Sequence, residues 1–435
     1  MPLADDDGRG GAFGGIGAFA LADAPLEGGR RVVYLNAASR TPMLRRVYDV
    51  GVAAVARKLL PWTIDDADDD AAAVRALFAR LLCATGGDVA LAPSCSYAVS
   101  VAARSLAAAR RVASGSELLV LQDQMSSNVY PWQALARDAG ARVRAVARPA
   151  DGDWSRAVCE AISAGRTAVV ALPHVHWTDG ALLDLRTIGA RCADARAALV
   201  VDATQSLGAL PLDAGGVRAD FVMASTHKWL LGPYGCCPLY ASVEWQRLGV
   251  PIEEHERARA AAAGGRDVPF ALPRGASDVP YDELFASCAR RLDAGGRPNP
   301  VLLPMVAEGL RHVLHWTPDA IGSHAAALSA RLAAWAARAG FAPPAGRAQH
   351  FVGLRRPTNS AAAWSSREEH AWAERLAGAL RARHAIHVAG RFGALRVSPH
   401  VYNTEADIDD LIRALRAEAE VEAQGASGAR ARARL

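Results

Sequence analysis

Short apolar runs alternate with segments of helical period through the middle of the chain. Between the runs, Ala, Leu and Arg recur at intervals that are typical of helices. Buried parallel strands joined by crossover helices produce this pattern. We therefore predict a mainly parallel sheet, with strands in the runs 117–123, 142–147, 167–175, 197–205 and 220–228.

The pattern changes at the Gly- and Pro-rich segment 295–300, where a long helical stretch begins. The following residues alternate between helix and strand, with strands predicted at 351–356 and 394–399 and a last helix at 404–420. A chain of 435 residues exceeds what one hydrophobic core usually holds. We expect a loose segment at 1–30, a large α/β domain at 31–298 whose first residues could join the small domain, a small α+β C-terminal domain at 299–420 and a flexible tail at 421–435.

Charge and cysteine usage narrow the function classes. The net charge is +4, and the basic residues are scattered among acidic ones, which disfavours a nucleic-acid partner. The seven cysteines are odd in number and form no CxxC pair, so we expect reduced thiols without disulfides or a metal site. Neither a signal peptide nor an apolar run long enough for a bilayer is present, so we expect a cytoplasmic protein without a membrane partner.

Two predicted strands end in complementary polar groups. Asp202 closes the run ALVV and Gln205 follows it, while Ser225, His227 and Lys228 close the next strand. Ligands of such sheets bind beyond the carboxyl ends of the strands. We therefore expect these side chains to project into one crevice, where burial favours the neutral amine that a Schiff base requires.

This set of groups matches pyridoxal 5′-phosphate (PLP). Lys228 would form the internal aldimine, and Asp202 would keep the pyridine nitrogen protonated so that the ring can accept electrons. Gln205 could bind the phenolic oxygen of the ring, and Ser225 and His227 could bind the phosphate. Each of these residues alone is commonly structural, but their combination is uncommon.

The segments VVDATQSLGALPLD and ADFVMASTHKWLLGPYG closely resemble the class V aminotransferase family of PLP enzymes of fold type I. This family includes cysteine desulfurases, selenocysteine lyase, isopenicillin N epimerase-like proteins and, more distantly, kynureninase. The resemblance extends from 34–42 to 398–415. It implies a seven-stranded-type sheet with a smaller C-terminal domain, and a homodimer with active sites at the subunit interface. It also implies an amino-acid substrate that forms an external aldimine.

The resemblance assigns further roles by position. Cys95 and Ser96, in APSCSYAVSVAA, occupy the phosphate turn at a helix start. Arg396, in ALRVSP, matches the arginine that binds the substrate α-carboxylate, for which a guanidinium is well suited. The remaining assignments are Arg297 and Asn299 toward the partner subunit's phosphate, and Asn36 and Tyr97 as substrate contacts.

The chain departs from the family pattern at three points. Met125 stands where many members place a histidine over the ring, and a thioether can pack there but cannot transfer protons. Trp177 replaces an asparagine that contacts the cofactor oxygen, and it offers one donor and a stacking surface. No cysteine follows Cys288, which argues against a desulfurase with a persulfide intermediate.

The leading prediction is a PLP-dependent enzyme that acts on an amino acid or amine through Schiff-base and quinonoid chemistry, as an aminotransferase or a C–S or C–N lyase. A kynureninase-like hydrolase or an epimerase of the same family remains open. A nucleotide-binding oxidoreductase is disfavoured because no GxGxxG follows an early strand. A non-catalytic module with the same fold would have no use for the lysine, the aspartate and the phosphate turn together.

Overall fold

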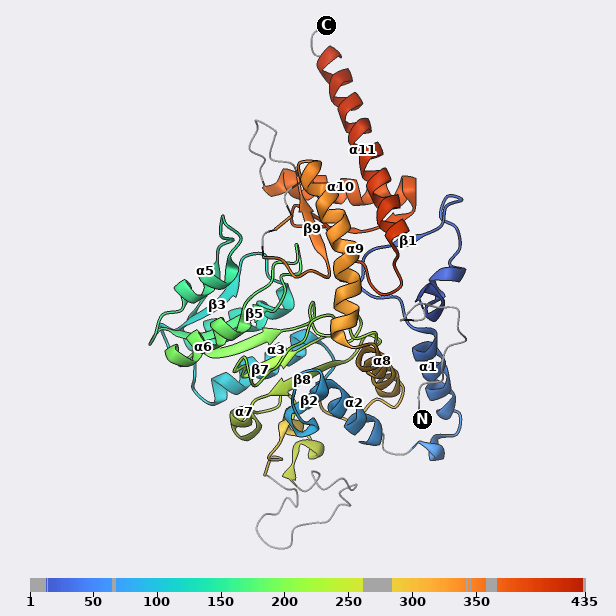
Figure 1. Cartoon of the computed structure of the whole chain (residues 1–435). Coiled ribbons are helices and arrows are strands. Elements are labelled where there is room, and N and C mark those ends of the chain that lie inside the picture. The colour runs from blue at the N-terminus through green and yellow to red at the C-terminus, as the bar shows by residue number, and fades with distance from the viewer. Residues whose placement is uncertain are drawn as a thin grey trace, which may run out of the picture. The chain divides into compact units, whose positions relative to one another are not determined.

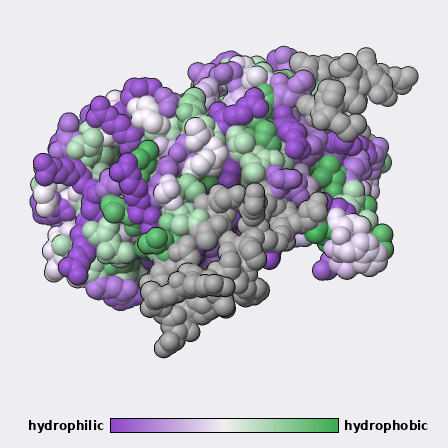
Figure 2. Space-filling model, turned by 90° about the horizontal axis from the view of Figure 1, so that it is seen from below, coloured by the Kyte–Doolittle hydropathy of each residue, from purple (hydrophilic) through white to green (hydrophobic). Residues whose placement is uncertain are grey.

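The computed structural model describes residues 13, 15–64, 68–260, 284–341, 343–344, 346–356 and 366–432. The chain divides into two compact units, a larger one of residues 43–177 and 182–318 and a smaller one of residues 1–42, 178–181 and 319–435. Within the described ranges, no helix is long and apolar enough to cross a membrane. Hydrophilic and hydrophobic residues are interspersed on the face shown in Figure 2.

The larger unit contains a seven-stranded sheet in the order β2-β8-β7-β6-β5-β3-β4 (Figure 1). The strands from β7 to β4 run parallel, whereas β8 is antiparallel to both of its neighbours. The predicted α/β fold is therefore confirmed. The strands are β2 Val89–Ala92, β3 Glu117–Leu121, β4 Arg142–Val146, β5 Thr167–Pro173, β6 Ala198–Asp202, β7 Phe221–Met223 and β8 Cys237–Ala241.

Helices cover both faces of this sheet because side chains alternate along each strand. Val200 of β6 joins the core beneath α3, whereas its neighbour Leu199 lies against Gly189 of α6. Strands buried on both faces read as continuous apolar runs, which explains the sequence pattern. The helices are α1 Arg45–Arg57, α2 Asp68–Arg80, α3 Cys95–Ala108, α4 Tyr130–Ala139, α5 Trp154–Ala161, α6 Leu185–Ala195, α7 Val243–Leu248 and α8 Leu302–Trp316.

The units differ from the predicted domains at the C-terminal boundary of the large domain. Residues 299–318 belong to the larger unit, whereas residues 31–42 belong to the smaller one, as the prediction allowed. The Gly- and Pro-rich turn at 295–300 suggested a boundary, but α8 packs against α1 and α2 and buries one face of apolar side chains, including Val306 and Leu310. The domain therefore ends after this helix rather than before it.

The smaller unit contains two short sheets. β1 (Val33–Tyr34) pairs in parallel with β10 (Ile386–His387), and an antiparallel sheet has the order β11-β12-β9. Apolar side chains of these strands and of the helices form a separate core. The other elements are β9 Val352–Arg355, β11 Ala389–Arg391, β12 Ala394–Val397, α9 Pro318–Arg338, α10 Ser366–His384 and α11 Glu405–Arg432.

Both termini correct the predicted loose segments in part. α11 continues through Arg432, so residues 421–432, expected as a flexible tail, are helical. Near the N-terminus, Gly15–Ala18 and Ala20–Asp23 form 3-10 helices, and Phe19 between them is fully buried. Residues 1–12 of the predicted loose segment lie outside the described residues.

Candidate active site

Asp202 is the last residue of β6, in the interior of the seven-stranded sheet. The side chain is buried, with 7% exposure. Its Oδ1 accepts a hydrogen bond of 2.9 Å from the Thr204 backbone N–H, and the Cys95 thiol lies 3.5 Å from Oδ2. These contacts come from neutral groups. A buried carboxylate in such surroundings is stabilised when a cation is added, so Asp202 is suited to a protonated ring nitrogen.

Lys228 does not end a strand, contrary to the prediction. β7 ends at Met223, which pairs with Asp202, and the chain then turns. The backbone N–H of Ser225 donates to the Thr204 hydroxyl at 3.1 Å, so the segment that leads to Lys228 is tied to the turn that follows β6. The expected proximity of the two strand ends is thus achieved through a turn rather than a strand.

Thr226 holds the turn that carries Lys228. Its hydroxyl lies within hydrogen-bond distance of the carbonyl oxygens of Pro233, at 2.7 Å, and Cys236, at 3.0 Å. Gly232 packs so closely that an added Cβ would lie 2.9 Å from the Thr226 side chain. Lys228 is half-buried within this closed loop, which fixes the origin of its long side chain.

A hydrogen bond between Gln205 and Trp229 is a second link between the turn after β6 and the turn that carries Lys228. The fully buried Trp229 donates from Nε1 to Gln205 Oε1 at 3.1 Å. Gly208, with a φ of +101°, approaches so closely that an added Cβ would lie 2.3 Å from the Trp229 carbonyl oxygen. Only glycine fits this backbone conformation and spacing. The residue after Lys228 is therefore locked against the turn that carries Gln205.

The start of α3 supplies the candidate phosphate turn. Ser94 precedes the helix, and its hydroxyl accepts a 3.2 Å hydrogen bond from the Tyr97 backbone N–H. The hydroxyls of Ser94 and Ser96 lie 3.0 Å apart, and Ser96 is exposed. A helix start with hydroxyl groups and a positive dipole end favours an anion. Cys95 and Ser96 are its first two residues, as the predicted role requires.

The Cys95 side chain faces the interior rather than this anion site. A hydrogen bond with Cys237, burial and the nearby Asp202 carboxylate raise the pKa of the Cys95 thiol well above its usual value. The thiol therefore stays protonated and can donate to Asp202. Cys95 thus contributes to the site through its backbone position and through contact with the aspartate.

The predicted ring-stacking residues have different surroundings. Met125 is 40% exposed and precedes a 3-10 turn. Trp177 donates from Nε1 to the Asp123 carbonyl oxygen at 2.7 Å, so its single donor is directed to the backbone. Trp177 is therefore suited to stacking and not to donation to a cofactor oxygen. The His227 ring is stacked on Tyr234, with centroids 3.9 Å apart.

His174 is a site residue that sequence reasoning missed. Its backbone N–H donates to the Asp202 carbonyl oxygen at 3.0 Å, and its Nδ1 lies 2.9 Å from the Ser206 hydroxyl. Burial lowers the pKa of His174 to about 4, so the ring is neutral near pH 7. The ring therefore supports the turn that carries Gln205. The sequence signal that could have identified His174 is its position directly after β5, the strand that neighbours β6.

Tyr97 is engaged within the larger unit. Its hydroxyl donates to Glu253 Oε2 at 3.0 Å. Burial, followed by this hydrogen bond and the Glu253 charge, raises the pKa of Tyr97. Glu253 Oε2 also accepts a hydrogen bond of 2.5 Å from the Gly295 backbone N–H. The predicted substrate contact by Tyr97 stays a prediction.

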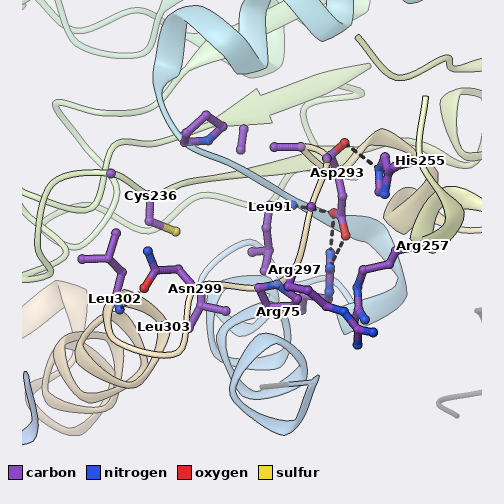
Figure 3. A pocket seen from close by; sticks show the side chains of 17 residues that line it. Arg75, Leu91, Cys236, His255, Arg257, Asp293, Arg297, Asn299, Leu302 and Leu303 are labelled. Atoms are coloured by element: carbon purple, nitrogen blue, oxygen red, sulfur yellow. Dashed lines mark hydrogen bonds and ion pairs between the residues drawn. The ribbon is translucent and has the colours of Figure 1, made fainter. Parts of the chain in front are cut away.

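Arg297 and Asn299 line a separate pocket of about 220 Å³ (Figure 3). Asn299 Oδ1 accepts hydrogen bonds from the backbone N–H groups of residues 301 and 302, so it caps α8. On the same pocket, Arg75 forms two hydrogen bonds with the Asp293 carboxylate, at 3.0 and 2.5 Å. The residues that the structure places around this pocket include neither the candidate lysine nor its aspartate.

Arg396 and Asn36 belong to the smaller unit, where they contact each other. Arg396 is 1% exposed, and its Nη2 lies 2.5 Å from Ser39 Oγ and 3.5 Å from Asn36 Oδ1. Burial, followed by the charge of Arg391, lowers the pKa of Arg396 to about 9. A buried guanidinium that is disfavoured in this way gains stability from a carboxylate.

Lysine is rare in this chain. Only two of the 49 Lys and Arg residues are lysines, Lys58 and Lys228. Lys58 is exposed at the end of α1, whereas Lys228 is half-buried in the turn that Thr226 holds. Arginine cannot replace lysine in a Schiff base because its guanidinium stays protonated. The half-buried amine at position 228 could therefore form a Schiff base that the arginine side chains could not.

The donor set of the larger unit fits PLP. A half-buried amine, a buried carboxylate with neutral neighbours, an amide and a helix start with hydroxyl groups correspond to its aldehyde, pyridine nitrogen, phenolic oxygen and phosphate. Lys228, Asp202, Gln205 and Ser96 carry these groups. Hydrogen bonds tie the Lys228 turn to the turn after β6, and the Cys95 thiol links the start of α3 to Asp202.

Comparisons with known proteins identify relatives of this chain. Residues 45–253 match the family Aminotransferase class-V. An uncharacterized aminotransferase, YcbU, of Bacillus subtilis is 27% identical over 76% of this chain and 79% of its own length. Isopenicillin N epimerase of Streptomyces clavuligerus is 28% identical over 67% of this chain and 68% of its own.

A solved structure shows the same fold. The cysteine desulfurase CsdA of Escherichia coli has a TM-score of 0.73 and 20% identity, over 93% of this chain and 97% of its own. The fold and the matched segment agree with the resemblance that the sequence motifs indicated. Over residues 45–253 the chain is similar to the class V aminotransferase family of PLP-dependent enzymes, and it has the fold of type I.

Proposed function

We propose that this protein is a PLP-dependent enzyme that acts on an amino acid or amine, as an aminotransferase or a C–S or C–N lyase. One observation carries the proposal. Asp202 ends β6, and Lys228, one of two lysines in the chain, follows the neighbouring parallel strand β7 on a turn tied to the Asp202 turn.

The proposal gives each residue a role that its position supports. PLP, when bound, supplies an electron sink for bonds to the α-carbon of an amino acid. Lys228 provides the amine that holds the cofactor aldehyde, and Asp202 holds a proton at the pyridine nitrogen. Gln205 faces the phenolic oxygen. Ser96, with the start of α3 around it, binds the phosphate together with Ser225 and His227.

The smaller unit provides the substrate carboxylate site in this proposal. Arg396 binds the α-carboxylate, and Asn36 orients the guanidinium through its side-chain oxygen. Burial of Arg396 excludes water from the ion pair, which strengthens it. Arg297 and Asn299 are assigned to the phosphate of a partner subunit, which the proposal places at a homodimer interface.

Helix α1 offers a surface for that homodimer. Tyr48, Val52 and Val55 of α1 and Leu59, two residues after it, recur at intervals of three or four residues, and all are exposed. An apolar stripe of this kind is typical of a protein interface.

The protein is proposed to be cytoplasmic. All seven cysteines are free thiols, which supports this location.

The positions of the cysteines and of Met125 restrict the PLP reactions that we propose. A desulfurase with a persulfide on a C-terminal cysteine is not proposed, because no cysteine follows Cys288. Epimerisation is a second candidate, since a relative is an isopenicillin N epimerase. It requires a proton donor on each face of the α-carbon, and Met125 cannot be one of them.

A panel of amino acids and amines tests the proposal. The purified protein, loaded with PLP, is mixed with each compound while the visible absorbance of the cofactor is followed, with Lys228→Ala as the matched control. Accumulation of pyridoxamine phosphate indicates transamination, and a recovered spectrum with a released fragment indicates elimination. No spectral change with any compound would contradict the proposal.

A further inference from the structure

A second arginine reaches the predicted carboxylate site. Arg391 Nη2 lies 3.5 Å from Ser39 Oγ, the same oxygen that Arg396 Nη2 contacts at 2.5 Å. Arg391 Nη1 donates to the Gly390 carbonyl oxygen at 2.8 Å, which fixes the other arm of its guanidinium. Two positive groups therefore converge on one hydroxyl.

The two arginines come from one hairpin. Arg391 ends β11, and Arg396 lies on β12, the antiparallel neighbour. Arg391 is half-buried, as is Ser39, whereas Arg396 is fully buried. The cluster thus has a deep cation and a second, more accessible cation beside the same serine.

The electrostatics of this cluster favour an anion with more than one charge. Burial lowers the pKa of Arg391, an effect that the Glu374 charge opposes, and the Arg391 charge contributes to the lowered pKa of Arg396. Like charges in a desolvated site repel each other, and one carboxylate compensates one of them. Because Ser39 Oγ accepts from both guanidinium groups, its hydroxyl hydrogen remains available to donate to a ligand oxygen.

We propose that Arg391 is a specificity-determining residue that selects amino acids with a second anionic group, such as dicarboxylic amino acids. This inference rests on the proposed function for the role of Arg396 toward the α-carboxylate. Arg396 binds that carboxylate, and Arg391, with Ser39 beside it, receives the side-chain acid.

Matched ligand pairs test this assignment. L-Glutamate and L-glutamine have nearly the same shape and differ in one charge, so their dissociation constants are compared by spectral titration of the PLP-loaded, full-length protein. We expect glutamate to bind about ten-fold more tightly, the scale of one charge-assisted hydrogen bond. Arg391→Gln should bring the ratio to about one, and Arg391→Lys, which keeps the charge, should retain part of the preference.

A control variant and a melting-temperature measurement test the role of Arg391 independently of the cofactor. Arg413→Gln removes an exposed arginine of α11 and should leave the ratio unchanged. Glutarate and butyrate lack the amino group, so their effect on the melting temperature reports the arginine cluster without cofactor chemistry. Glutarate should stabilise the wild type more than butyrate does, and Arg391→Gln should remove the difference.

The outcomes separate this inference from the proposed function. Equal binding of glutamate and glutamine by the wild type, or a preference that persists in Arg391→Gln, would overturn the role of Arg391 while leaving the PLP chemistry intact. If no amino acid changes the cofactor spectrum but glutarate still depends on Arg391, the proposed function fails and the dianion site stands.

Discussion

The β6–β7 end of the larger unit and the arginine cluster of the smaller unit solve opposite electrostatic problems. At the first, Asp202 is held by neutral donors, and the turn with Lys228 is fixed through hydrogen bonds by Thr204, Thr226 and Trp229. At the second, two guanidinium groups share the hydroxyl of Ser39. The first arrangement suits one cofactor that all substrates share. The second suits the discrimination of substrates by their charge.

The comparison predicts that changes in the two regions have different signatures. Changes at the β6–β7 end should affect every substrate alike because all use the same cofactor. Changes in the cluster should affect charged substrates more than others.

Replacement of Lys228 should abolish turnover of all substrates. Lys228→Ala removes the only half-buried amine of a lysine in the chain, while the fold should remain because the side chain is partly exposed. Absorbance of the cofactor Schiff base and turnover are measured together. Lys58→Arg, which removes the other lysine, is the matched control and should behave as the wild type does. A fully active Lys228→Ala protein would contradict the proposed role of Lys228 in holding the cofactor.

Replacement of Asp202 should slow exchange of the substrate α-proton on the order of 10²- to 10³-fold, as loss of one preorganised electrostatic partner does. Asp202→Asn keeps the shape of the side chain but not its charge. Exchange in deuterated water is followed by NMR, and the exposed Asp151→Asn serves as control. Near-wild-type exchange would exclude a proton held at the ring nitrogen.

Arg396→Ala should weaken binding of amino acids about 10- to 100-fold, because it removes a charge-assisted hydrogen-bond partner of the carboxylate. Amines that lack a carboxylate should lose little affinity. Dissociation constants for amino acid and amine pairs provide the measurement. Equal losses for both classes would move the carboxylate site away from the smaller unit.

His174 should make the protein sensitive to acid. Its pKa is lowered from 6.5 to about 4 on folding, so the unfolded chain binds more protons between these values, and stability is lost as pH falls below about 6.5. At pH 5 this amounts to about 2 kcal/mol. In His174→Gln, unfolding by denaturant should depend less on pH over this range, whereas the exposed His315→Gln should match the wild type. Identical pH profiles for His174→Gln and wild type would refute the assignment.

The smallest effect is expected at Trp177. Trp177→Phe removes the hydrogen bond to the Asp123 carbonyl oxygen and should cost about 1 kcal/mol of stability. The cofactor spectrum should change little, since the indole N–H is directed to the backbone. A large spectral shift without a loss of stability would place that N–H on the cofactor instead.

The two regions also differ in how far the sequence could predict them. Asp202 and Lys228 were found because polar residues that end apolar strands are visible in a single sequence. The strand β7 was predicted through Lys228 but ends at Met223, since turn formation by Thr226 depends on contacts with residues seven and ten positions later. The antiparallel strands β2 and β8 were not predicted, because short edge and bridging strands lack the repeated pattern of strand and crossover helix.

The arginine cluster shows the other limit. Arg396 was predicted only through the family resemblance, and Arg391 was missed. Residues 39 and 391 are far apart in the sequence, and no periodicity brings them together. Their contact depends on the pairing of β1 with β10 and of β11 with β12, which a local pattern does not reveal.

Chemical trapping of the cofactor tests the central claim most directly. The PLP-loaded protein is reduced with borohydride, digested and analysed by mass spectrometry, which locates the phosphopyridoxyl group on a peptide. We predict one modified lysine, Lys228, with Lys58 unmodified. A protein that carries no such group, or carries it on Lys58, would contradict the account.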